Sequence, residues 1–387
     1  MEKNKPQIRF NGFSENSQPF QLGKICVIGD IDHRMPPTVS NGVPYLMTGD
    51  FIGLNELDFE NAKLVSIEDY NQLSKKIKPE LGDILFARYA SIGDVRYVET
   101  SKNFLISYSC AIIKKSDSIF EKYLYYYFQN NKIQNQIELE INTGSQRNIG
   151  IDSIRKLIFQ LPKETEQKKI STFFENLDKL ITEHQQKHSK LKTLKKAMLS
   201  KMFPQQGQTV PEIRFKGFTG NWEEKKLGNI SKITTGISNR IDSGLDGDYA
   251  FFDRSDDIRR SNIFLFDCEA IIVAGEGSDF IPKYFKGKFD LHQRTYAIID
   301  FKNIIGRYLF YYVHFNRKHF LDHAVGSTVK SLRQPIFENM VIMFPKEDEQ
   351  ILISNYFKNI DHLIFNHELQ INKLQNIKKA FLAKMFI

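Results

Sequence analysis

Two polar loops in the sequence carry side chains suited to binding nucleic acid. The loop TGSQRNIG contains Ser145, Gln146, Arg147 and Asn148, and the loop VGSTVKSL, with the residue after it, contains Ser327, Thr328, Lys330 and Arg333. Arg, Asn and Gln can read base edges through hydrogen bonds, whereas Lys, Ser and Thr suit phosphate oxygens. Any one of these residues could equally be a solvated surface residue, but the two loops together favour contact with DNA.

Further candidate DNA-binding residues lie in the variable parts of the chain. The stretch GDILFARYASIGDVRYVE (residues 82–99) predicts a strand, a loop and another strand. It carries Arg88, Tyr89, Ser91 and Arg96, and the second half of the chain carries Asn239, Arg240, Arg254, Arg259, Arg260, Lys283 and Arg294.

Signatures of catalysis are weak throughout the sequence. No GxxxxGK(S/T) phosphate loop occurs, and GEGSDF (residues 275–280) lacks the third glycine of a dinucleotide-binding turn. HELQI at His367 begins like a zinc-protease helix but has no second His, and no Cys/His cluster has metal-ligand spacing. No group of carboxylates with a Lys indicates a nuclease. The sequence therefore predicts no catalytic residue, no metal site and no cofactor bound by this chain.

Composition is consistent with a basic cytoplasmic protein. The 387 residues carry a formal net charge of +8, which suits a polyanion partner but is weak evidence alone. Cys26, Cys110 and Cys268 form no CxxC pair, as expected for free thiols in a reducing compartment. No apolar run reaches the roughly 18 residues of a membrane span, and the polar N-terminus has no signal-peptide pattern. We therefore expect no membrane partner.

A duplicated segment of the sequence predicts the long helices that hold these polar loops in place. Residues 162–203, from PKETEQ to KMF, recur without a gap as residues 345–386, which indicates a duplicated module. Both copies place apolar residues at heptad a and d positions over about five heptads, without an internal Pro or Gly. The pattern predicts two long coiled-coil helices, each about 60 Å in length at about 1.5 Å per residue.

The two helices are expected to pack against each other in antiparallel fashion. The expected interhelix core consists of Ile170, Leu177, His184 and Leu191 from the first helix, and of Ile360, His367, Leu374 and Phe381 from the second. Both His residues lie near the middle of their helices. We expect them to form a polar layer that fixes the register of the pair.

An entry motif is duplicated as well. PQIRFNGF at residue 6 returns as PEIRFKGF at residue 211, so the repeated unit is an entry motif, a globular region and a long helix. The predicted boundaries are residues 1–162 for the first globular domain, 163–203 for the first helix, 204–345 for the second domain with a short linker, and 346–387 for the second helix. The predicted fold class is α+β: two globular α/β domains joined by two long antiparallel helices, with an internal pseudo-twofold duplication.

The chain resembles the specificity subunit of a type I restriction–modification system. The resemblance is carried by the duplicated entry motif, the duplicated helix from PKEDEQ to KMF, GDILFARYASIGDVRYV and the loop Gly326-Ser327-Thr328. The resemblance covers essentially the whole chain. It departs at Ser17-Gln18, where the second unit has Trp222-Glu223, and at Glu269-Ala270, where the first unit has Gly82-Asp83.

The resemblance implies a set of partners. Two target-recognition domains would each bind one half of an interrupted site in double-stranded DNA, and the helices would set the distance between the half-sites. The helices would also dock two methyltransferase subunits, which bind S-adenosylmethionine, and motor-nuclease restriction subunits, which use ATP and Mg, would join that core. A coiled-coil scaffold with degenerate globular domains is the alternative. A free-standing enzyme is disfavoured because methylation and nuclease motifs are missing.

Overall fold

The structure, a computed structural model, describes residues 5–144 and 146–386 of the chain. These residues form two compact units. The first unit combines the chain up to Gln186 with the chain from Glu368 onward, and the second unit is Lys187–His367. No helix in the described parts of the chain has the length and apolar character that crossing a membrane requires.

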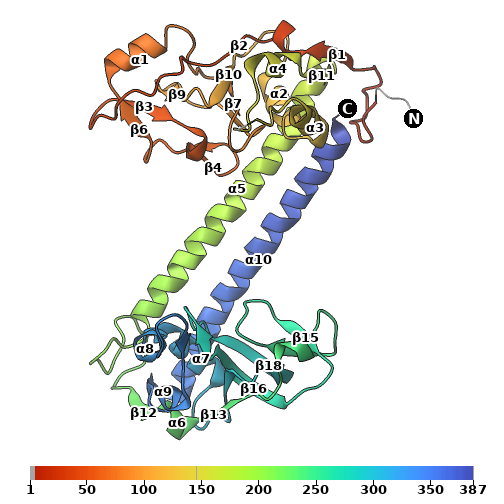
Figure 1. The fold of residues 1–387 in the computed structure, drawn as a ribbon. Coiled ribbons are helices and arrows are strands. Elements are labelled where there is room, and N and C mark those ends of the chain that lie inside the picture. Colours follow the sequence, from red (N-terminus) through yellow and green to blue (C-terminus); the bar gives the residue numbers. More distant parts are fainter. Residues whose placement is uncertain (1–4, 145, 387) are drawn as a thin grey trace. The chain divides into compact units, whose positions relative to one another are not determined.

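Two long helices contribute to both units. Helix α5 (Glu164–Lys201) and helix α10 (Glu347–Met385) begin with acidic residues and carry a lysine in the last turn, an order of charges that suits the helix dipole. Their heptad pattern, free of Pro and Gly, explains why neither helix is interrupted. The first unit holds the beginning of α5 and the end of α10, and the second unit holds the end of α5 and the beginning of α10 (Figure 1).

Within each unit the two helix segments run antiparallel. In the first unit Asp178, from the early part of α5, pairs with Lys378 from the late part of α10 at 2.7 Å. In the second unit Asp361, from the early part of α10, pairs with Lys195 from the late part of α5 at 2.5 Å. The expected antiparallel helix pair and the internal duplication are therefore confirmed.

The first unit is a mixed α+β domain. Its strands are β1 (Gln18–Gln21), β2 (Ile28–Gly29), β3 (Val43–Leu46), β4 (Phe51–Ile52), β5 (Glu56–Leu57), β6 (Lys63–Val65), β7 (Ile84–Ala87), β8 (Val95–Tyr97), β9 (Leu105–Ile106), β10 (Cys110–Ile113) and β11 (Ile158–Leu161). Its short helices are α1 (Ile67–Leu73), α2 (Glu121–Tyr127), α3 (Asn131–Leu139) and α4 (Ile151–Lys156). The central sheet has the order β2-β10-β7-β8, a three-stranded sheet has the order β6-β3-β9, and β1 pairs with β11. The expected strand, loop and strand at residues 82–99 are β7 and β8, which pair antiparallel.

The second unit has the same frame with a larger sheet. Its strands are β12 (Glu223–Lys226), β13 (Lys232–Thr235), β14 (Tyr249–Phe252), β15 (Arg259–Ser261), β16 (Phe266–Ala274), β17 (Glu276–Gly277), β18 (Lys283–Leu291), β19 (Thr295–Ile299), β20 (Lys330–Ser331) and β21 (Val341–Phe344). Its short helices are α6 (Leu227–Ile230), α7 (Gly306–Phe315), α8 (Lys318–His323) and α9 (Gln334–Glu338). The main sheet has the order β13-β19-β16-β18-β14-β15, and β12 pairs with β21 as β1 pairs with β11.

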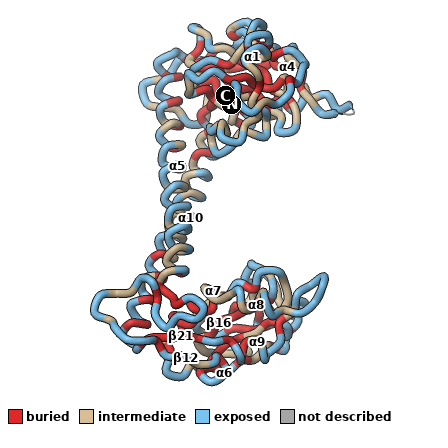
Figure 2. The backbone as a smooth tube through the Cα atoms, turned by 90° about the vertical axis from the view of Figure 1, so that its left-hand side faces the viewer, coloured by how far each residue is buried: buried red, intermediate tan, exposed pale blue. Residues whose placement is uncertain are grey.

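Each unit has an aromatic core that a distant part of the chain completes, and Figure 2 shows buried backbone, in red, within each unit. In the first unit Phe386, at the end of α10, is 1% exposed and lies 5.2 Å from Tyr127 and 5.7 Å from Phe174, measured between ring centroids. In the second unit Phe203, at the end of α5, is fully buried and stacks on Phe357 at 5.9 Å. The Met and Phe of each KMF ending are thus core residues, in the unit opposite to the one where the helix begins.

Buried ion pairs fasten the entry motifs to the long helices. Arg9 donates both Nε and Nη2 to Glu166 at 2.7 Å, and Arg214 donates the same two atoms to Glu349 at 2.7 Å. Both carboxylates are almost fully buried. The duplicated I-R-F sequence is therefore explained by a duplicated bidentate contact with the third residue of each long helix.

Most of the expected interhelix core lies close to the globular domains. Ile170, Leu177 and Ile360 are buried, and Leu374 and Phe381 pack against the core of the first unit. Leu191 and the two His residues, His184 and His367, are half-buried. His184 belongs to the first unit and His367 to the second, so their pairing stays a prediction.

Candidate nucleic-acid interface

Within and just before the TGSQRNIG segment, Asn142 and Asn148 pair in an isolated antiparallel bridge beside the β7–β8 connection, and we call residues 142–148 the first polar loop. Asn142 and Asn148 form its base through backbone hydrogen bonds of 2.8 and 3.4 Å, and Asn142 Nδ2 donates to Asn148 Oδ1 at 3.2 Å. Ser145 lies outside the described residues. The geometry makes Asn148 a residue that shapes the loop, whereas the exposed side chains of Gln146 and Arg147 are available to a ligand.

A hollow of about 660 Å³, the first hollow, opens between this loop and the β7–β8 connection. Its lining consists of Ala90, Ser91, Ile92, Asp94, Glu138, Ile141, Gln146 and Arg147. Arg147 donates to Glu138, at the end of α3, at 2.7 Å. Ala90 adopts a φ of 53°, an unusual conformation for a residue other than glycine, and thereby turns the connection sharply at the rim of the hollow. Three of the predicted residues, Ser91, Gln146 and Arg147, thus share one concave surface.

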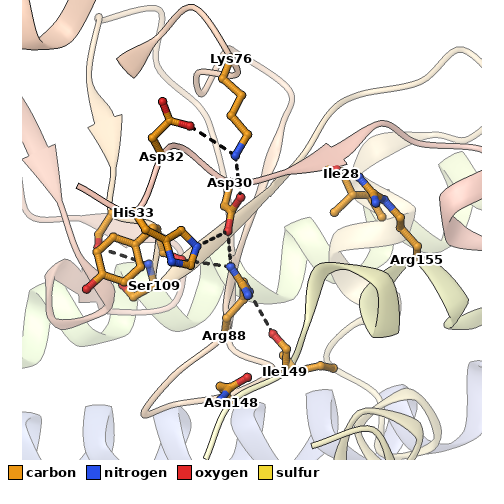
Figure 3. Close-up of polar contacts among 12 residues, drawn as sticks. Ile28, Asp30, Asp32, His33, Lys76, Arg88, Ser109, Asn148, Ile149 and Arg155 are labelled. Atoms are coloured by element: carbon orange, nitrogen blue, oxygen red, sulfur yellow. Dashed lines mark hydrogen bonds and ion pairs between the residues drawn. The ribbon is translucent and has the colours of Figure 1, made fainter. Parts of the chain in front are cut away.

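Arg88 has a different environment from the one the sequence suggested. Its side chain is buried, with Nη1 donating to Asp30 Oδ2 and, at 3.2 Å, to the Tyr108 carbonyl (Figure 3). Its Nε donates to the Ile149 carbonyl at 2.9 Å. A guanidinium with these partners is occupied inside the protein, so the contacts of Arg88 indicate a structural role instead of base reading.

Asp30 is the residue around which this buried network is arranged. His33 Nε2 and Lys76 Nζ each lie 3.2 Å from its carboxylate oxygens, in addition to the bond from Arg88. Burial would raise the pKa of Asp30, but hydrogen bonds from His33 and Lys76 and the charge of Arg88 outweigh it and hold this pKa below its ordinary value. The sequence analysis missed Asp30, since a lone carboxylate carries no spacing signal.

Among the described residues, Tyr89 and Arg96 are not part of the lining of the first hollow. The Arg88 guanidinium lies over the Tyr89 ring at 5.7 Å. Arg96 lies on β8, with its guanidinium over the Phe51 ring at 5.0 Å and Nη1 donating to the neighbouring Val95 carbonyl at 2.8 Å. Burial lowers the pKa of Arg96. These contacts hold the Arg96 side chain within the fold, and none of its described contacts is with the first polar loop.

The second unit has a larger hollow in the equivalent place. This second hollow, of about 800 Å³, is lined by Arg240, Arg254, Lys283, Ser327, Thr328 and Lys330 among the predicted residues. Asp253, Asp256, Glu276 and Asp279 add carboxylates to the same lining. An adjoining hollow of about 330 Å³ shares Arg240 and Arg254 and adds Asn239 and Arg294. The structure thus brings eight of the predicted residues together.

Charges in the second hollow are partly compensated by neighbours. Arg240 pairs with the buried Asp253 at 3.1 Å, and Arg294 pairs with Glu276 at 2.9 Å. Lys283 Nζ donates to the Ser255 carbonyl at 2.5 Å, and burial lowers its pKa. No spacing pattern in the sequence marks these carboxylates as part of a site, so they were not among the predicted residues. A carboxylate can accept a hydrogen bond from the cytosine amino group, so the lining offers both donors and acceptors to base edges.

Three predicted residues of the second unit do not line either hollow among the described residues. Arg259 Nη2 donates to the Ser243 carbonyl at 3.0 Å, and Arg260 donates to the carbonyls of Gly247 and Asp248 at 2.9 Å each. These two arginines therefore brace the loop before β14. Arg333 is exposed and immediately precedes α9.

Matching hydrogen bonds show that the two hollows occupy equivalent positions. In the first unit the Arg88 carbonyl accepts from Ile149, the residue after the first polar loop, at 3.1 Å. In the second unit the Gly275 carbonyl accepts from Leu332, the residue after the second polar loop (residues 325–331), at 2.8 Å. The frame is repeated while the lining side chains differ. In the described residues no three His, Cys, Asp or Glu side chains are grouped to hold a metal ion.

Comparison with known proteins gives a consistent family. The model of the type I restriction modification DNA specificity domain matches residues 14–193 and 219–376. The EcoDI specificity subunit of Escherichia coli is 29% identical over 161 residues, which are 42% of this chain and 36% of that protein. The MjaVIII specificity subunit of Methanocaldococcus jannaschii is 26% identical over 46% of each chain, so the matches span less than half of these two relatives. A putative MjaX specificity subunit of the same organism is 24% identical over 88% of both chains.

Solved structures agree on the fold. The type I restriction–modification S subunit of M. genitalium superimposes with a TM-score of 0.69 and covers 99% of both chains at 15% identity. A second chain, from work on complex assembly and conformational transition of the type I R-M system, gives a TM-score of 0.55 over 96% of this chain and 97% of that one. At 15% identity these likenesses establish the fold alone.

Proposed function

The chain belongs to the type I restriction–modification DNA specificity family, and from this premise we propose that it reads a DNA site in two halves, one with each unit, and is itself non-catalytic. In this proposal the first hollow contacts one half-site and the second hollow contacts the other. The protein acts in the cytoplasm on double-stranded DNA.

One observation carries the proposal: the two units repeat the same frame around hollows that have unlike linings. The first hollow offers Ser91, Gln146 and Arg147, whereas the second offers several arginines and lysines together with carboxylates. A protein with only a scaffolding task would have no need of two equivalent concave surfaces with different donors and acceptors. Two different readers on one frame suit an asymmetric, two-part DNA sequence.

The long helices support a role as spacer and docking surface. Helices α5 and α10 contain 38 and 39 residues, and at about 1.5 Å per residue each is roughly 57 Å long. We propose that they set the number of unread base pairs between the half-sites. We also propose that two methyltransferase subunits dock on them and bind S-adenosylmethionine, and that restriction subunits using ATP and Mg complete the assembly.

A methylome is the first test of the function. The protein is co-expressed with its neighbouring methyltransferase subunit in a host without adenine methylation, and methyladenine is mapped across the genome. We expect one motif with two short half-sites around a fixed gap. A soluble complex of the two proteins that leaves the genome unmethylated would contradict the proposal and favour the degenerate scaffold.

Replacing Gln146 and Arg147 together with Ala is expected to weaken binding to the first half-site by roughly tenfold to a hundredfold, because one good paired base contact contributes about 1–3 kcal/mol. Discrimination at the second half-site should be unchanged. The measurement is competition binding with oligonucleotides altered in one half-site at a time. The matched control replaces Thr328 and Lys330 with Ala and should show the opposite pattern, and equal losses at both half-sites in either variant would refute the assignment of one hollow to each.

Lengthening the helix pair is expected to change only the number of unread base pairs between the two half-sites. Four residues are inserted at equivalent places in both helices, within residues 187–194 of α5 and residues 370–377 of α10. At about 1.5 Å per residue the insertions add about 6 Å, which corresponds to one or two base pairs of roughly 3.4 Å each. The methylated motif should keep both half-sites and gain that spacing. A change in either half-site, with the gap unaltered, would count against the spacer role.

A further inference from the structure

Arg88 holds the residue that follows the first polar loop at two points. Its carbonyl accepts from the Ile149 amide at 3.1 Å, and its Nε donates to the Ile149 carbonyl at 2.9 Å (Figure 3). Both backbone polar groups of Ile149 are therefore bonded to one residue. Ile149 is itself fully buried, so the end of the loop is fixed against the C-terminal end of β7, an inner strand of the central sheet.

The other side of the Arg88 guanidinium is fastened to Asp30. Nη1 donates to the Asp30 carboxylate and to the Tyr108 carbonyl. The Asp30 carboxylate also forms hydrogen bonds with His33 and Lys76. Asp30 is 8% exposed. Without Arg88 the buried Asp30 carboxylate would keep, among the described residues, only Lys76, at 3.2 Å, as a neighbouring lysine or arginine, and would lose a charge-assisted hydrogen bond, so the pair resists separation.

The second unit fixes the same two points by other means. The amide of Leu332 donates to the Gly275 carbonyl at 2.8 Å, and the Leu332 carbonyl accepts from the Tyr296 hydroxyl at 3.3 Å. Gly275 stands where Arg88 stands in the first unit, and a Cβ there would lie 2.4 Å from the Arg294 carbonyl oxygen. No side chain can be accommodated at Gly275, and Tyr296 on β19 supplies the second bond instead.

We propose that Arg88 and Asp30 are positioning residues for base reading in the first unit: together they clamp the first polar loop at Ile149, and Tyr296 clamps the second polar loop at Leu332. The part of this inference that concerns base reading rests on the proposed function. The clamp itself is a property of the DNA-free protein.

A direct contact between Arg88 and DNA is the competing explanation. It would require the guanidinium to give up its bonds to Ile149, Tyr108 and Asp30 and to leave Asp30 buried without that partner. One phosphate contact would have to replace a preformed set of hydrogen bonds, and the geometry points to the clamp.

The first experiment measures amide hydrogen exchange in the full-length protein without DNA. Arg88→Lys keeps the charge but loses Nε, and Asp30→Asn keeps the shape but loses the charge. In both variants the amides of Asn142, Asn148 and Ile149 should exchange about tenfold faster, as expected for loss of one hydrogen bond to a charged group. Arg34→Lys is the matched control, because Arg34 pairs with Asp69 on the exposed surface of the same unit, and it should leave these amides unchanged.

The second experiment measures how well each variant discriminates between DNA sequences. Competition binding uses the complex with the methyltransferase subunit and DNA altered at each position of one half-site at a time. Arg88→Lys and Asp30→Asn should both lower discrimination across the first half-site about tenfold, and the double variant should be no worse than either single one because the residues act through one contact. Tyr296→Phe should lower discrimination at the second half-site only.

The outcomes separate the two explanations. If Arg88→Lys removes preference at a single base position, while Asp30→Asn leaves reading intact, Arg88 contacts DNA and the clamp is overturned. Unchanged amide exchange in both variants would also overturn it. If the exchange rates rise as expected but the parent protein discriminates no DNA sequence, the clamp stands and the proposed function fails.

Discussion

Replacing Phe386 with Ala, near the C-terminal end of the chain, is expected to destabilise the N-terminal globular unit by about 3–5 kcal/mol, the cost typical of truncating a buried phenylalanine. The ring is 1% exposed and lies among Tyr123, Tyr127 and Phe174, which come from residues far earlier in the sequence. Removing it leaves a cavity that these aromatic side chains cannot fill without leaving their own contacts.

The position of the single tryptophan makes this prediction easy to check. Trp222 is 4% exposed in the second unit, so its fluorescence during urea unfolding reports on that unit alone. In Phe386→Ala the Trp222 transition should keep its midpoint, while hydrogen exchange in β7 and β10 accelerates. The equivalent variant in the other repeat, Phe203→Ala, should shift the Trp222 transition and spare β7 and β10. A shift of the Trp222 midpoint in Phe386→Ala equal to that in Phe203→Ala would show that the two cores do not unfold separately.

Arg214→Met is expected to destabilise the second unit by about 3–5 kcal/mol, because it leaves a buried carboxylate without its cation. The side chain of Glu349 is 1% exposed, and both of its oxygens accept from Arg214 at 2.7 Å. Met conserves the apolar stem of Arg and so limits the loss of packing.

The reciprocal variant supplies the control. Arg9→Met breaks the equivalent pair with Glu166 in the first unit and should leave the Trp222 unfolding midpoint unchanged. Double variants that also replace the glutamate by Gln should recover part of the stability, since the buried charge is then removed. If Arg214→Met costs less than about 1 kcal/mol, the value typical of an exposed pair, the contact contributes no more than a surface ion pair.

Local sequence patterns predicted the elements that depend on local physics. The heptads and the absence of Pro and Gly predicted two uninterrupted helices, and α5 and α10 are found there. The fold class is confirmed by the domain model and by the solved structures, and the family is confirmed by the domain model. That each KMF ending completes the core of the opposite unit could not be read from the repeat, because heptad positions say which face is apolar and not which globular core receives it.

The residues that line the hollows were predicted well in the polar loops between apolar strands. They were predicted less well where the charged side chain is bonded inside the fold. Gln146, Thr328 and Lys330 line the hollows, as their loop setting suggested. Arg88, Arg259 and Arg260 look identical to readers in a sequence, yet their guanidinium groups bond to Asp30 or to backbone carbonyls. Such partners come from other strands, so only the folded chain distinguishes a reading arginine from a bracing one. That the lining residues contact DNA, through bases or phosphates, stays a prediction.

The contribution of α10 to the first unit has a consequence for the order in which the protein can be made. During synthesis from the N-terminus, domains usually fold in the order in which they leave the ribosome. Here the second unit is one continuous segment, Lys187–His367, whereas the first unit needs residues from Glu368 onward. Lys132 and Phe386, which are in contact within it, are 254 residues apart in the sequence. The second unit can therefore complete its core while the first, although translated earlier, waits on the ribosome for the segment that closes it.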